Sequence, residues 1–432
     1  AREACPTCAV LVACRRPGPS GSSFANRNDA LGVQVPLDDA EREAFVQEVL
    51  DLGRPGFVDA KLVQILAEEG RERFEEMFAL GLRFRGDAEG LKRFPGCGSR
   101  RPGAYIFDGL RQTFARFEHR AATVGVNFNS DITVLGLLVG EAGCHGVWGL
   151  DGAGQRVVIR ARAVIMAAGG PAPLFRHRVC GPANDGTSPA LLQRAGCELR
   201  NTGCLQFLWY TRDKEYVCPA SLAGPEARII ADGREIAPEF DPDLLSMRRT
   251  HCPAFIGRPD TVIDRWLSDH AADDGFVTVR TSKGVVEVAP MAHAGNGGAI
   301  IGLNGETSVP GLFAVGECAT GMHGANRLGG AMVLATQVFG KRAGEAAADH
   351  ALSAVDIGPG GVEVPEAPGP VQEEVISRIR EGMQCFAAPY AKEGLAGFAA
   401  ELAATARRFD GTTGLTAEAA HRVANGYLTD DV

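Results

Sequence analysis

The chain has 432 residues, of which 45% are hydrophobic and 22% are charged, and its formal net charge at pH 7 is −9. This length and composition suit two to three globular domains with buried cores. The negative charge and the scattered arginines argue against nucleic-acid binding. Every apolar stretch is far too short to cross a bilayer, so we expect no direct membrane insertion.

Twelve cysteines are dispersed along the sequence. In a chain of this size without a secretion signal, we expect reduced thiols and a cytoplasmic location rather than a disulfide framework. The only closely spaced pair, Cys5 and Cys8, lacks a second CxxC or a paired histidine motif. We therefore predict no metal site.

In chain order, residues 8–16 (CAVLVACRR) predict a short buried strand that ends in a proline- and glycine-rich loop. Residues 37–83 place apolar side chains at helical spacing and predict paired amphipathic helices. Residues 124–139 are rich in β-branched side chains, and residues 146–170 predict a hairpin around the turn GLDGAG, followed by a buried strand.

The pattern changes between residue 206 and about residue 288, where Trp209 and Trp266 occur, proline is frequent and no alternation of strands and helices is visible. We interpret this segment as an inserted domain. Residues 337–352 open a helix, residues 356–370 form a proline- and glycine-rich linker, and residues 371–424 are helical in pattern.

The strongest chemical signal is a predicted strand, glycine loop and helix between Gly311 and Gly340. Glycines in such a loop let backbone N–H groups and a helix N-terminus approach an anionic or polar ligand. A tight turn without a ligand is the alternative reading of the same glycines.

Residues 314–330, AVGECATGMHGANRLGG, resemble the flavin and dicarboxylate loop of the fumarate reductase, succinate dehydrogenase and L-aspartate oxidase flavoproteins. The resemblance implies that FAD is the cofactor, with Gly316 and Glu317 contacting it. It also implies that Arg327 binds a substrate carboxylate.

Three further segments resemble FAD-contacting parts of this family. They are residues 162–175 with Ala168, Gly169 and Gly170, residues 183–199 with Asp185 and Gly186, and residues 19–26 with Gly21, Ser22 and Ser23. Where some members carry a flavin-linking histidine, this loop offers only the two serines. We therefore expect non-covalent FAD.

His293, in PMAHAGNGG, matches the family's substrate histidine before a GG pair. Arg258 and Arg265 are rival candidates for the arginine that moves a proton. The family's histidine after a QF pair is Leu208 here, which removes one usual carboxylate ligand, and residues 331–335 also depart from the family pattern. For His323, a structural role and a role in the site both stay open.

The resemblance implies an α/β fold. Its parts are a Rossmann-like FAD-binding domain at 1–205 and 290–355, an inserted α+β capping domain at 206–289, and a C-terminal helical domain at 371–432. The glycine fingerprint GxGxxG that should open the first domain is absent. We expect the strand and helix that carry it to precede Ala1.

The implied function is hydride transfer between FAD and a small carboxylate such as fumarate, succinate or L-aspartate. The alternative is an FAD-binding electron-transfer subunit of a larger redox complex without dicarboxylate turnover. An iron–sulfur or other electron-transfer protein is the expected partner in either case.

Overall fold

The computed structural model describes residues 1–25, 30–99, 101–354, 363–390 and 392–429. The end of the predicted 19–26 loop and the first half of the predicted 356–370 linker lie outside these ranges. None of the helices in the described part of the chain combines the length and the apolar character that a membrane crossing requires.

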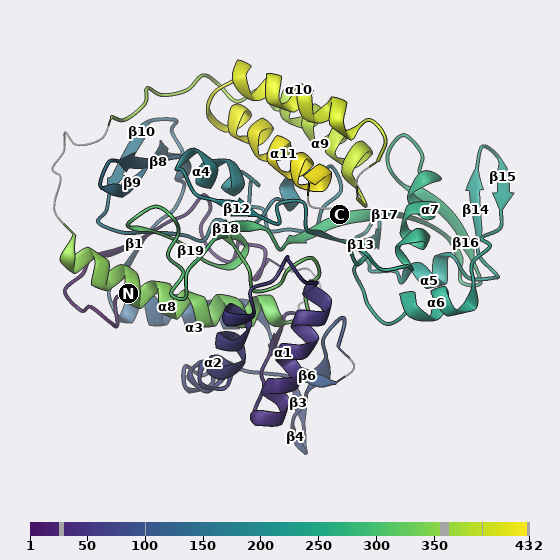
Figure 1. Ribbon diagram of the computed structural model, residues 1–432, viewed down its shortest axis with the longest axis horizontal. Helices are drawn as coiled ribbons and strands as arrows, with labels where there is room; N and C mark the ends of the chain where they lie inside the picture. Colours follow the sequence, from purple (N-terminus) through teal and green to yellow (C-terminus); the bar gives the residue numbers. More distant parts are fainter. Residues whose placement is uncertain (26–29, 100, 355–362, 391, 430–432) are drawn as a thin grey trace.

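The helices lie mainly on the outside of the molecule, around short strands (Figure 1). They are α1 (Asp39–Gly53), α2 (Ala60–Ala79), α3 (Leu110–Thr123), α4 (Ser188–Arg194), α5 (Pro219–Leu222), α6 (Pro242–Arg248), α7 (Thr261–Asp269), α8 (Ala331–Ser353), α9 (Glu373–Ala387), α10 (Leu395–Arg408) and α11 (Gly411–Thr429).

The strands of the first half are β1 (Val10–Ala13), β2 (Gly32–Gln34), β3 (Gly86–Asp87), β4 (Gly90–Leu91), β5 (Phe94–Pro95), β6 (Pro102–Ile106), β7 (Val126–Asn129), β8 (Thr133–Gly140), β9 (Gly143–Leu150), β10 (Arg156–Arg160) and β11 (Val164–Met166). Those of the second half are β12 (Leu199–Arg200), β13 (Leu205–Thr211), β14 (Arg228–Ala231), β15 (Arg234–Ile236), β16 (Val277–Thr281), β17 (Gly284–Gly295), β18 (Gly298–Ile300), β19 (Leu312–Ala314) and β20 (Ala319–Thr320).

Parallel pairing joins β1 with β7, β11 with β19 and β18 with β20. Strand β1 lies within the predicted 8–16 segment, but the prediction that it is buried was wrong: Leu11 is 43% and Val12 38% exposed. Successive side chains of a strand point to opposite faces, and Leu11 and Val12 are both exposed, so neither face of the β1–β7 pair is fully covered at these positions.

Helices α1 and α2 are the paired helices that the apolar spacing predicts. Each begins at an aspartate whose side chain accepts a backbone N–H, Asp38 for α1 and Asp59 for α2, and such caps stabilise helix starts. The C-terminal end of α1 carries the buried residues Leu52 and Gly53. There Ala325 donates its N–H to the carbonyl of Gly53 at 2.8 Å, so α1 ends against the glycine loop.

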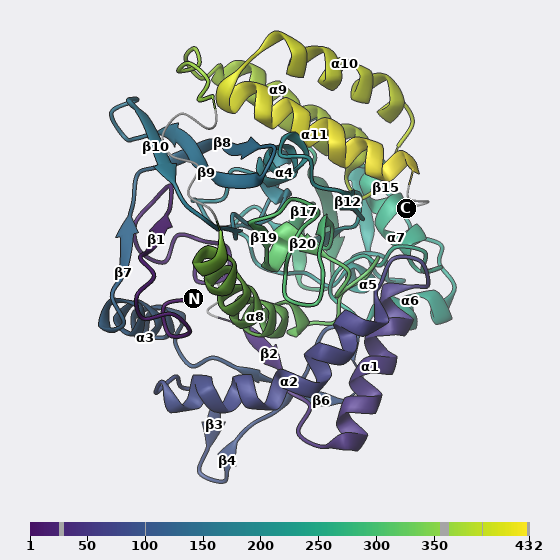
Figure 2. The same cartoon turned by 60° about the vertical axis from the view of Figure 1, so that its left-hand side comes forward.

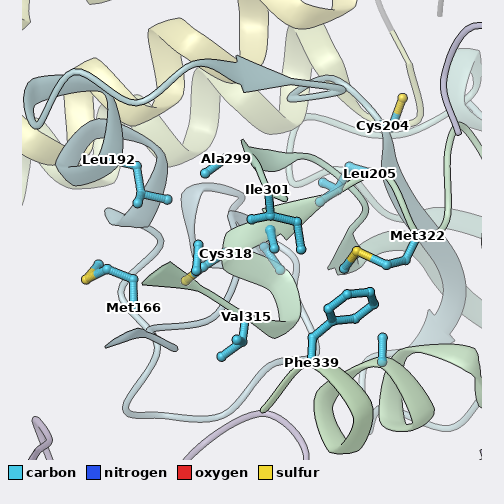
Figure 3. Close-up of a cluster of buried hydrophobic side chains, with 14 of the residues drawn as sticks. Met166, Leu192, Cys204, Leu205, Ala299, Ile301, Val315, Cys318, Met322 and Phe339 are labelled. Atoms are coloured by element: carbon cyan, nitrogen blue, oxygen red, sulfur yellow. The ribbon is translucent and has the colours of Figure 1, made fainter. Parts of the chain in front are cut away.

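Helix α8 begins at Ala331, earlier than the predicted position near 337. Its first turns are apolar and buried between β19 and α2, so tertiary packing extends the helix into the end of the glycine loop. Figure 3 shows Phe339 of α8 in the same apolar cluster as Met166 and Val315, which lie at the ends of β11 and β19.

A second hydrophobic core lies within residues 206–289, which we refer to as the inserted unit. Its sheet has the strand order β13-β17-β16-β14-β15, and its core is formed by fully buried side chains from β13, β14, α7, β16 and β17 (Trp209, Ile229, Ile263, Leu267, Val277, Val279 and Val288). Strands β13 and β17 continue into the first core through Phe207 and Ala292. The domain boundaries themselves stay a prediction.

The C-terminal helices α9, α10 and α11 pack against one another and form a layer over β8 and α4 (Figure 2). The helical pattern of residues 371–424 thus corresponds to three helices.

Cys97 and Cys252 form a disulfide, with their Cα atoms 5.9 Å apart. The expectation that all cysteines are reduced thiols was wrong for this pair. The two residues are 155 positions apart in the sequence and meet only through the tertiary fold, which no local pattern reveals. The other ten cysteines form no disulfide.

A buried ion pair anchors the inserted unit. Asp264 on α7 accepts hydrogen bonds from Trp209 Nε1 at 2.7 Å and from Arg248 Nε at 2.8 Å, and both side chains of the ion pair are 0% exposed. Arg248 also donates to the carbonyls of His251 and Cys252. The pair therefore fixes the segment that carries Cys252.

Replacing Asp264 by alanine should destabilise the protein strongly, because it leaves the buried guanidinium of Arg248 without its counter-charge. The expected loss is about 3–5 kcal/mol in the free energy of unfolding. Guanidinium denaturation followed by tryptophan fluorescence measures it. Asp269→Ala, at an exposed position of the same helix, is the control and should change stability by less than about 0.5 kcal/mol. Equal losses in the two variants would contradict this role.

Candidate functional site

The parallel pairing of β11 with β19 brings two glycine-containing loops together. Met166 is the register partner of Ala314, so both strands end at the same edge of the sheet. The residues that follow are Ala168 to Gly170 on one strand and Gly316 and Glu317 on the other. The carboxyl ends of parallel strands are the usual place for ligands in open α/β sheets.

This edge is lined by bare backbone. A Cβ atom on Gly170 would lie 2.5 Å from Oε1 of Glu317, so a side chain there would displace the Glu317 carboxyl group. Gly169 has a φ of +83°, which other residues rarely adopt. The side chain of Ala168 is exposed, although its N–H is bonded to the buried sulfur of Cys318 at 3.2 Å. The loop thus presents main chain and a methyl group rather than large side chains.

Glu317 connects this edge to β17. Its Oε1 accepts the N–H of Gly295 at 2.8 Å. Burial raises the pKa of Glu317, while the hydrogen bond from Gly295 and the charge of Arg327 oppose that rise. A carboxyl group in this setting is a strong hydrogen-bond acceptor toward any hydroxyl beside it.

The predicted serine loop is linked to the same edge. Gly181 donates its N–H to Oγ of Ser22 at 3.1 Å, and a Cβ on Gly181 would lie 2.3 Å from the carbonyl carbon of Gly21. Asn184 continues the link, because its Nδ2 donates to the carbonyl of Gly170 at 3.0 Å. The structure therefore places the loop with Gly21 and Ser22 next to residues 181–184, of which Asn184 is bonded to Gly170. Ser23 is exposed.

Asp185 and Gly186 lie at the start of α4. The Asp185 carboxylate accepts the N–H and the hydroxyl of Thr187, at 3.1 and 2.7 Å. Gly186 has a φ of +82° and donates its N–H to Asn184. In the structure Asp185 thus organises the loop, and its contact with a cofactor stays a prediction.

His293 occupies a β-bulge. On β17, Ala294 pairs with Gln206 and Ala292 pairs with Phe207, so His293 is the extra residue between two consecutive partners on β13. Bulges of this kind re-aim side chains and are common next to active sites. The Nδ1 atom of His293 is buried and has no hydrogen-bond partner among the described residues.

Arg327 lies in the glycine loop and is held by Gln206. Its Nη2 donates to Oε1 of Gln206 at 2.7 Å, and Nε2 of Gln206 donates back to the Arg327 carbonyl at 3.4 Å. The residue keeps some exposed surface, yet its Nε atom is buried and lacks a partner among the described residues. Burial lowers the pKa of Arg327, and the carboxyl group of Glu317 acts against that lowering. A guanidinium in this state still has donors to offer to an anion.

Two imidazoles share the surroundings of Arg327. Burial lowers the pKa of His293 to about 4 and that of His323 to about 3, and the charge of Arg327 contributes to both shifts. Both nitrogens of His323 are buried without partners in the described chain, and the residue is 1% exposed. At neutral pH both rings are therefore uncharged, and each has one N–H donor and one acceptor nitrogen.

The rival arginines occupy different environments. Arg265 is exposed on α7, whereas Arg258 is partly buried and its guanidinium lies 5.8 Å from the ring centroid of Phe255. Nearby, Ile256 donates its N–H to Oδ1 of Asn326 at 2.7 Å. This hydrogen bond holds residues 256–258 next to Asn326, which directly precedes Arg327.

Leu208 pairs with Met291 across β13 and β17 and packs into a small apolar cluster with Tyr210 and Phe276. The position that the resemblance associates with a carboxylate ligand is thus apolar. Ala335 is fully buried in α8.

The sequence reading missed two residues that organise the site, Gln206 and Asn326. Gln206 is a polar residue that is 4% exposed within a strand of buried side chains. The sequence shows only that Gln206 lies in the apolar run LQFLW, which indicates an internal hydrogen-bond partner but not which residue it is. Asn326 bonds to the backbone of both Leu52 and Ile256, which are distant in sequence, so its role required the fold.

Two surface cavities lie elsewhere, one of about 410 Å³ beside Phe409 and one of about 550 Å³ between α2 and α8. The second is lined by ion-paired residues such as Glu69 and Arg342. Among the described residues, no group of three or more histidine, cysteine or acidic side chains is arranged to hold a metal ion.

His293 and His323 should make the protein less stable in mild acid. Each has an ordinary pKa of 6.5 and a lower one in the fold, so the unfolded chain binds protons first as the pH falls. Stability is therefore fully present above pH 6.5 and is lost toward pH 4. His323→Gln should make the loss shallower, by at most about 1.4 kcal/mol per pH unit. Denaturation midpoints measured at several pH values test this, with His119→Gln at an exposed position as the control. An unchanged slope in His323→Gln would refute the buried neutral state.

The sequence of this chain matches that of known FAD-binding proteins. Residues 28–211 and 259–333, more than half of the chain, match the FAD binding domain family. A CoM/CoB fumarate reductase polypeptide from Methanothermobacter marburgensis is 28% identical over 69% of this chain and 60% of that protein. The L-aspartate oxidase of Bacillus subtilis is 30% identical over 70% of this chain and 56% of that protein. The chain thus spans about three fifths of the length of these curated relatives.

Solved structures show the same fold. The Sdh1 complex of Mycobacterium smegmatis in the apo form matches 98% of this chain and 83% of its own, with a TM-score of 0.75 and 17% identity. A quinol-fumarate reductase with menaquinol molecules matches 98% of this chain and 85% of its own, with a TM-score of 0.73 and 18% identity. These likenesses confirm the predicted α/β fold class. The chain belongs to the FAD binding domain family, and its cofactor is FAD, as the sequence resemblance predicted.

Proposed function

We propose that this chain is an FAD-dependent oxidoreductase that acts on a small carboxylate, which Arg327 and His293 bind. The observation that carries the proposal is the burial and incomplete hydrogen bonding of Arg327. It is a largely enclosed guanidinium, oriented by Gln206, with a buried and unpartnered Nε among the described residues. An arginine cannot lose its charge in a protein, so burying it without a bound anion lowers the stability of the fold. A carboxylate ligand would offset this loss by pairing with the guanidinium.

The residues present fit a flavin nucleotide. The backbone from Ala168 to Gly170 carries no large side chain, and Glu317 offers a carboxyl acceptor at the same edge. We propose that these residues hold the cofactor together with Gly316 and the loop of Gly21 and Ser22. The linkage is proposed to be non-covalent, because neither serine of that loop can form a histidyl bond.

The bound flavin would exchange a hydride with a carbon of the substrate. The chain's own groups would bind and polarise that substrate. Arg327 can hold both oxygens of one carboxylate, and the neutral imidazole of His293 can donate one hydrogen bond to it. We propose that the guanidinium of Arg258 transfers the proton to or from the substrate. Ile256, two residues before Arg258, is hydrogen-bonded to Asn326, whereas Arg265 is exposed.

The names of the relatives support a small carboxylate as the substrate. A fumarate reductase and an L-aspartate oxidase are both named for substrates with two carboxyl groups. The proposed location is the cytoplasm.

Leu208 supports a second candidate function, an FAD-binding electron-transfer subunit with an iron–sulfur or other redox protein as its partner. The apolar side chain stands where the family resemblance places a carboxylate ligand. Assays of the purified flavoprotein with fumarate and reduced dye, and with succinate or L-aspartate and an oxidised dye, separate the two functions. An electron-transfer subunit would turn over none of the three substrates.

Glu317→Ala should lower FAD occupancy without unfolding the chain. A charge-assisted hydrogen bond to a ribityl or ribose hydroxyl contributes about 1.5–3 kcal/mol, so FAD binding should weaken roughly tenfold to a hundredfold. The ratio of flavin to protein absorbance after dilution and gel filtration measures the occupancy. Glu345→Ala, at an exposed position of α8, is the matched control. Full occupancy in Glu317→Ala would remove Glu317 from the cofactor site.

Arg327→Lys should reduce turnover by roughly two or more orders of magnitude while FAD occupancy is retained. Lysine keeps the positive charge but cannot hold both oxygens of a carboxylate, and the contact should tighten in the transition state. His293→Ala should cost less, since a neutral imidazole supplies a single hydrogen bond. Steady-state rates and FAD occupancy are measured on the same preparations, with Arg249→Lys at an exposed position as the control.

The alternative role for Arg327 is to brace the glycine loop. In that case lysine would lower FAD occupancy and turnover together. Parallel losses would rule out the carboxylate role, and with it most of the case for a dicarboxylate enzyme.

A further inference from the structure

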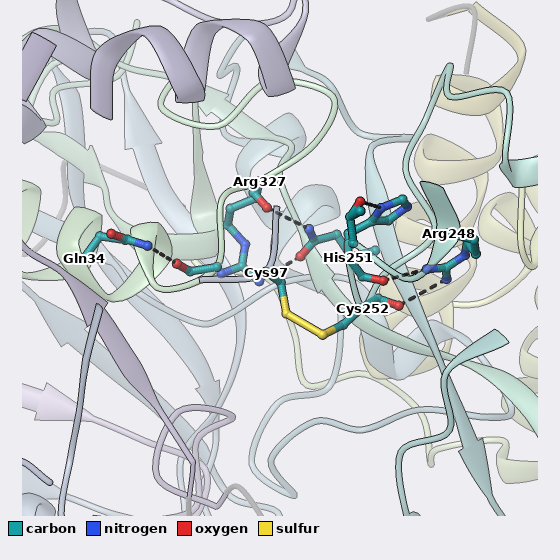
Figure 4. The surroundings of a disulfide bond; sticks show 9 residues. Gln34, Cys97, Arg248, His251, Cys252 and Arg327 are labelled. Atoms are coloured by element: carbon teal, nitrogen blue, oxygen red, sulfur yellow. Dashed lines mark hydrogen bonds between the residues drawn. A yellow bond between two sulfur atoms is a disulfide. The ribbon is translucent and has the colours of Figure 1, made fainter. Parts of the chain in front are cut away.

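The disulfide between Cys97 and Cys252 joins two parts of the molecule that meet at Arg327. Cys97 lies in the loop between β5 and β6, and Cys252 lies in the inserted unit between α6 and α7. Figure 4 shows the bond between Arg327 on one side and Arg248 on the other. A covalent bond at this place restricts how the inserted unit can move relative to the glycine loop.

On one side, the Cys97 loop is fitted closely to the end of the glycine loop. Gly329 donates its N–H to the Cys97 carbonyl at 2.8 Å. A Cβ on Gly96 would lie 2.3 Å from the carbonyl oxygen of Gly329, and Gln34 Nε2 donates to that oxygen at 3.0 Å. Cys97 is therefore bonded to the segment that immediately follows Arg327 in the chain.

On the other side, Cys252 is held by the buried ion pair of the inserted unit. Arg248 donates to the carbonyls of His251 and Cys252, at 2.7 and 3.1 Å, while it is paired with Asp264. The disulfide therefore connects the Arg327 loop with the rigid core of the inserted unit.

The same contact has a non-covalent component. Asn326 bonds to both backbone groups of Ile256, through its Oδ1 at 2.7 Å and its Nδ2 at 3.0 Å. These bonds do not involve the disulfide. Reduction should therefore loosen the contact between the two parts without separating them.

We propose that Cys97 and Cys252 form a reversible redox clasp that controls the opening of the inserted unit over Arg327. Both cysteines are partly exposed, so a reductant can reach them. Closed, the clasp fixes residues 251–256 against the Arg327 loop and slows the exchange of ligands. Open, it leaves the Asn326 bonds, the hydrogen bond from Tyr390 to the Ala254 carbonyl and the packing of Phe255 in the core, and lets the part of the segment next to Cys252 move. The proposal goes beyond the proposed function, and only its effect on turnover rests on that function.

Opening is a thiol–disulfide exchange with a dithiol reductant. One thiolate of the reductant attacks a sulfur of the pair and forms a mixed disulfide, and the second displaces it. The Cys97–Cys252 bond breaks, both sulfurs become thiols with the two protons of the reductant, and the reductant is oxidised to its own disulfide. Closing reverses these steps with a disulfide oxidant such as oxidised glutathione, which is reduced to two thiols.

The test compares the purified flavoprotein after treatment with oxidised glutathione and after treatment with dithiothreitol. Alkylation of the denatured protein should show ten free thiols in the first sample and all twelve in the second, with a peptide linked through Cys97 and Cys252 only in the first. Hydrogen exchange of residues 249–258 should be faster in the reduced sample, by at least about tenfold.

Cys97→Ser and Cys252→Ser should each show the fast exchange in both samples. Cys385→Ser, at an exposed free cysteine, should respond to the reductant like the unaltered protein. Turnover of fumarate with reduced dye should rise on reduction in the unaltered protein and not in the two clasp variants.

Absence of the linked peptide after oxidation would overturn the proposal, and so would equal exchange in the two samples of unaltered protein. A response to the reductant that persists in Cys97→Ser would also overturn it, because another thiol would then be the cause. The exchange and thiol measurements need no turnover. An inactive protein with a working clasp would thus count against the proposed function alone.

Discussion

The arrangement of this molecule depends on the enclosure of one permanent positive charge, the guanidinium of Arg327. Because arginine keeps its proton, the surrounding residues have to supply acceptors or neutral dipoles. Gln206 accepts from Nη2, and the carboxyl group of Glu317 lies near enough to oppose the effect of burial on the Arg327 pKa. The two nearest imidazoles are kept neutral by the same burial and the same charge. The site is therefore poor in internal anions and rich in donors.

Bare backbone is what lets the elements approach this charge closely. Gly53 of α1, Gly96 of the Cys97 loop and Gly329 of the glycine loop each lie where a Cβ would collide with a neighbouring main chain. Helix α1 and the Cys97 loop, which are distant in sequence, thus both pack against the glycine loop that carries Arg327. Asn326 and the disulfide then connect the glycine loop and the Cys97 loop to the inserted unit. The position of the inserted unit and the environment of the guanidinium are consequently set by the same contacts.

Much of the fold could be predicted from local pattern. The helices α1 and α2 follow from apolar spacing, the turn between β9 and β10 from its glycines, and the C-terminal helices from their periodicity. The start of α8 and the exposure of β1 could not be predicted, because both depend on which elements pack against them. The disulfide also depends on tertiary contact between residues 155 positions apart.

For the site, the sequence predicted the glycine loop, Glu317, Arg327 and His293, and the structure brings the segments of all three residues together around β19 and β17. Their roles toward FAD and substrate stay predictions. The bulge that re-aims His293 and the Gln206 bond to Arg327 were not foreseen, since each depends on the register of β13 against β17. The proposal of Arg258 over Arg265 likewise rests on exposure, which only the fold reveals.

A crystal structure of the FAD-bound protein grown with a small dicarboxylate tests the central claim most directly. The account predicts that one carboxylate of the ligand lies on Arg327, with both oxygens about 2.7–2.9 Å from guanidinium nitrogens and with His293 as a further donor. A dicarboxylate bound elsewhere, with Arg327 still bonded only to Gln206, would contradict it.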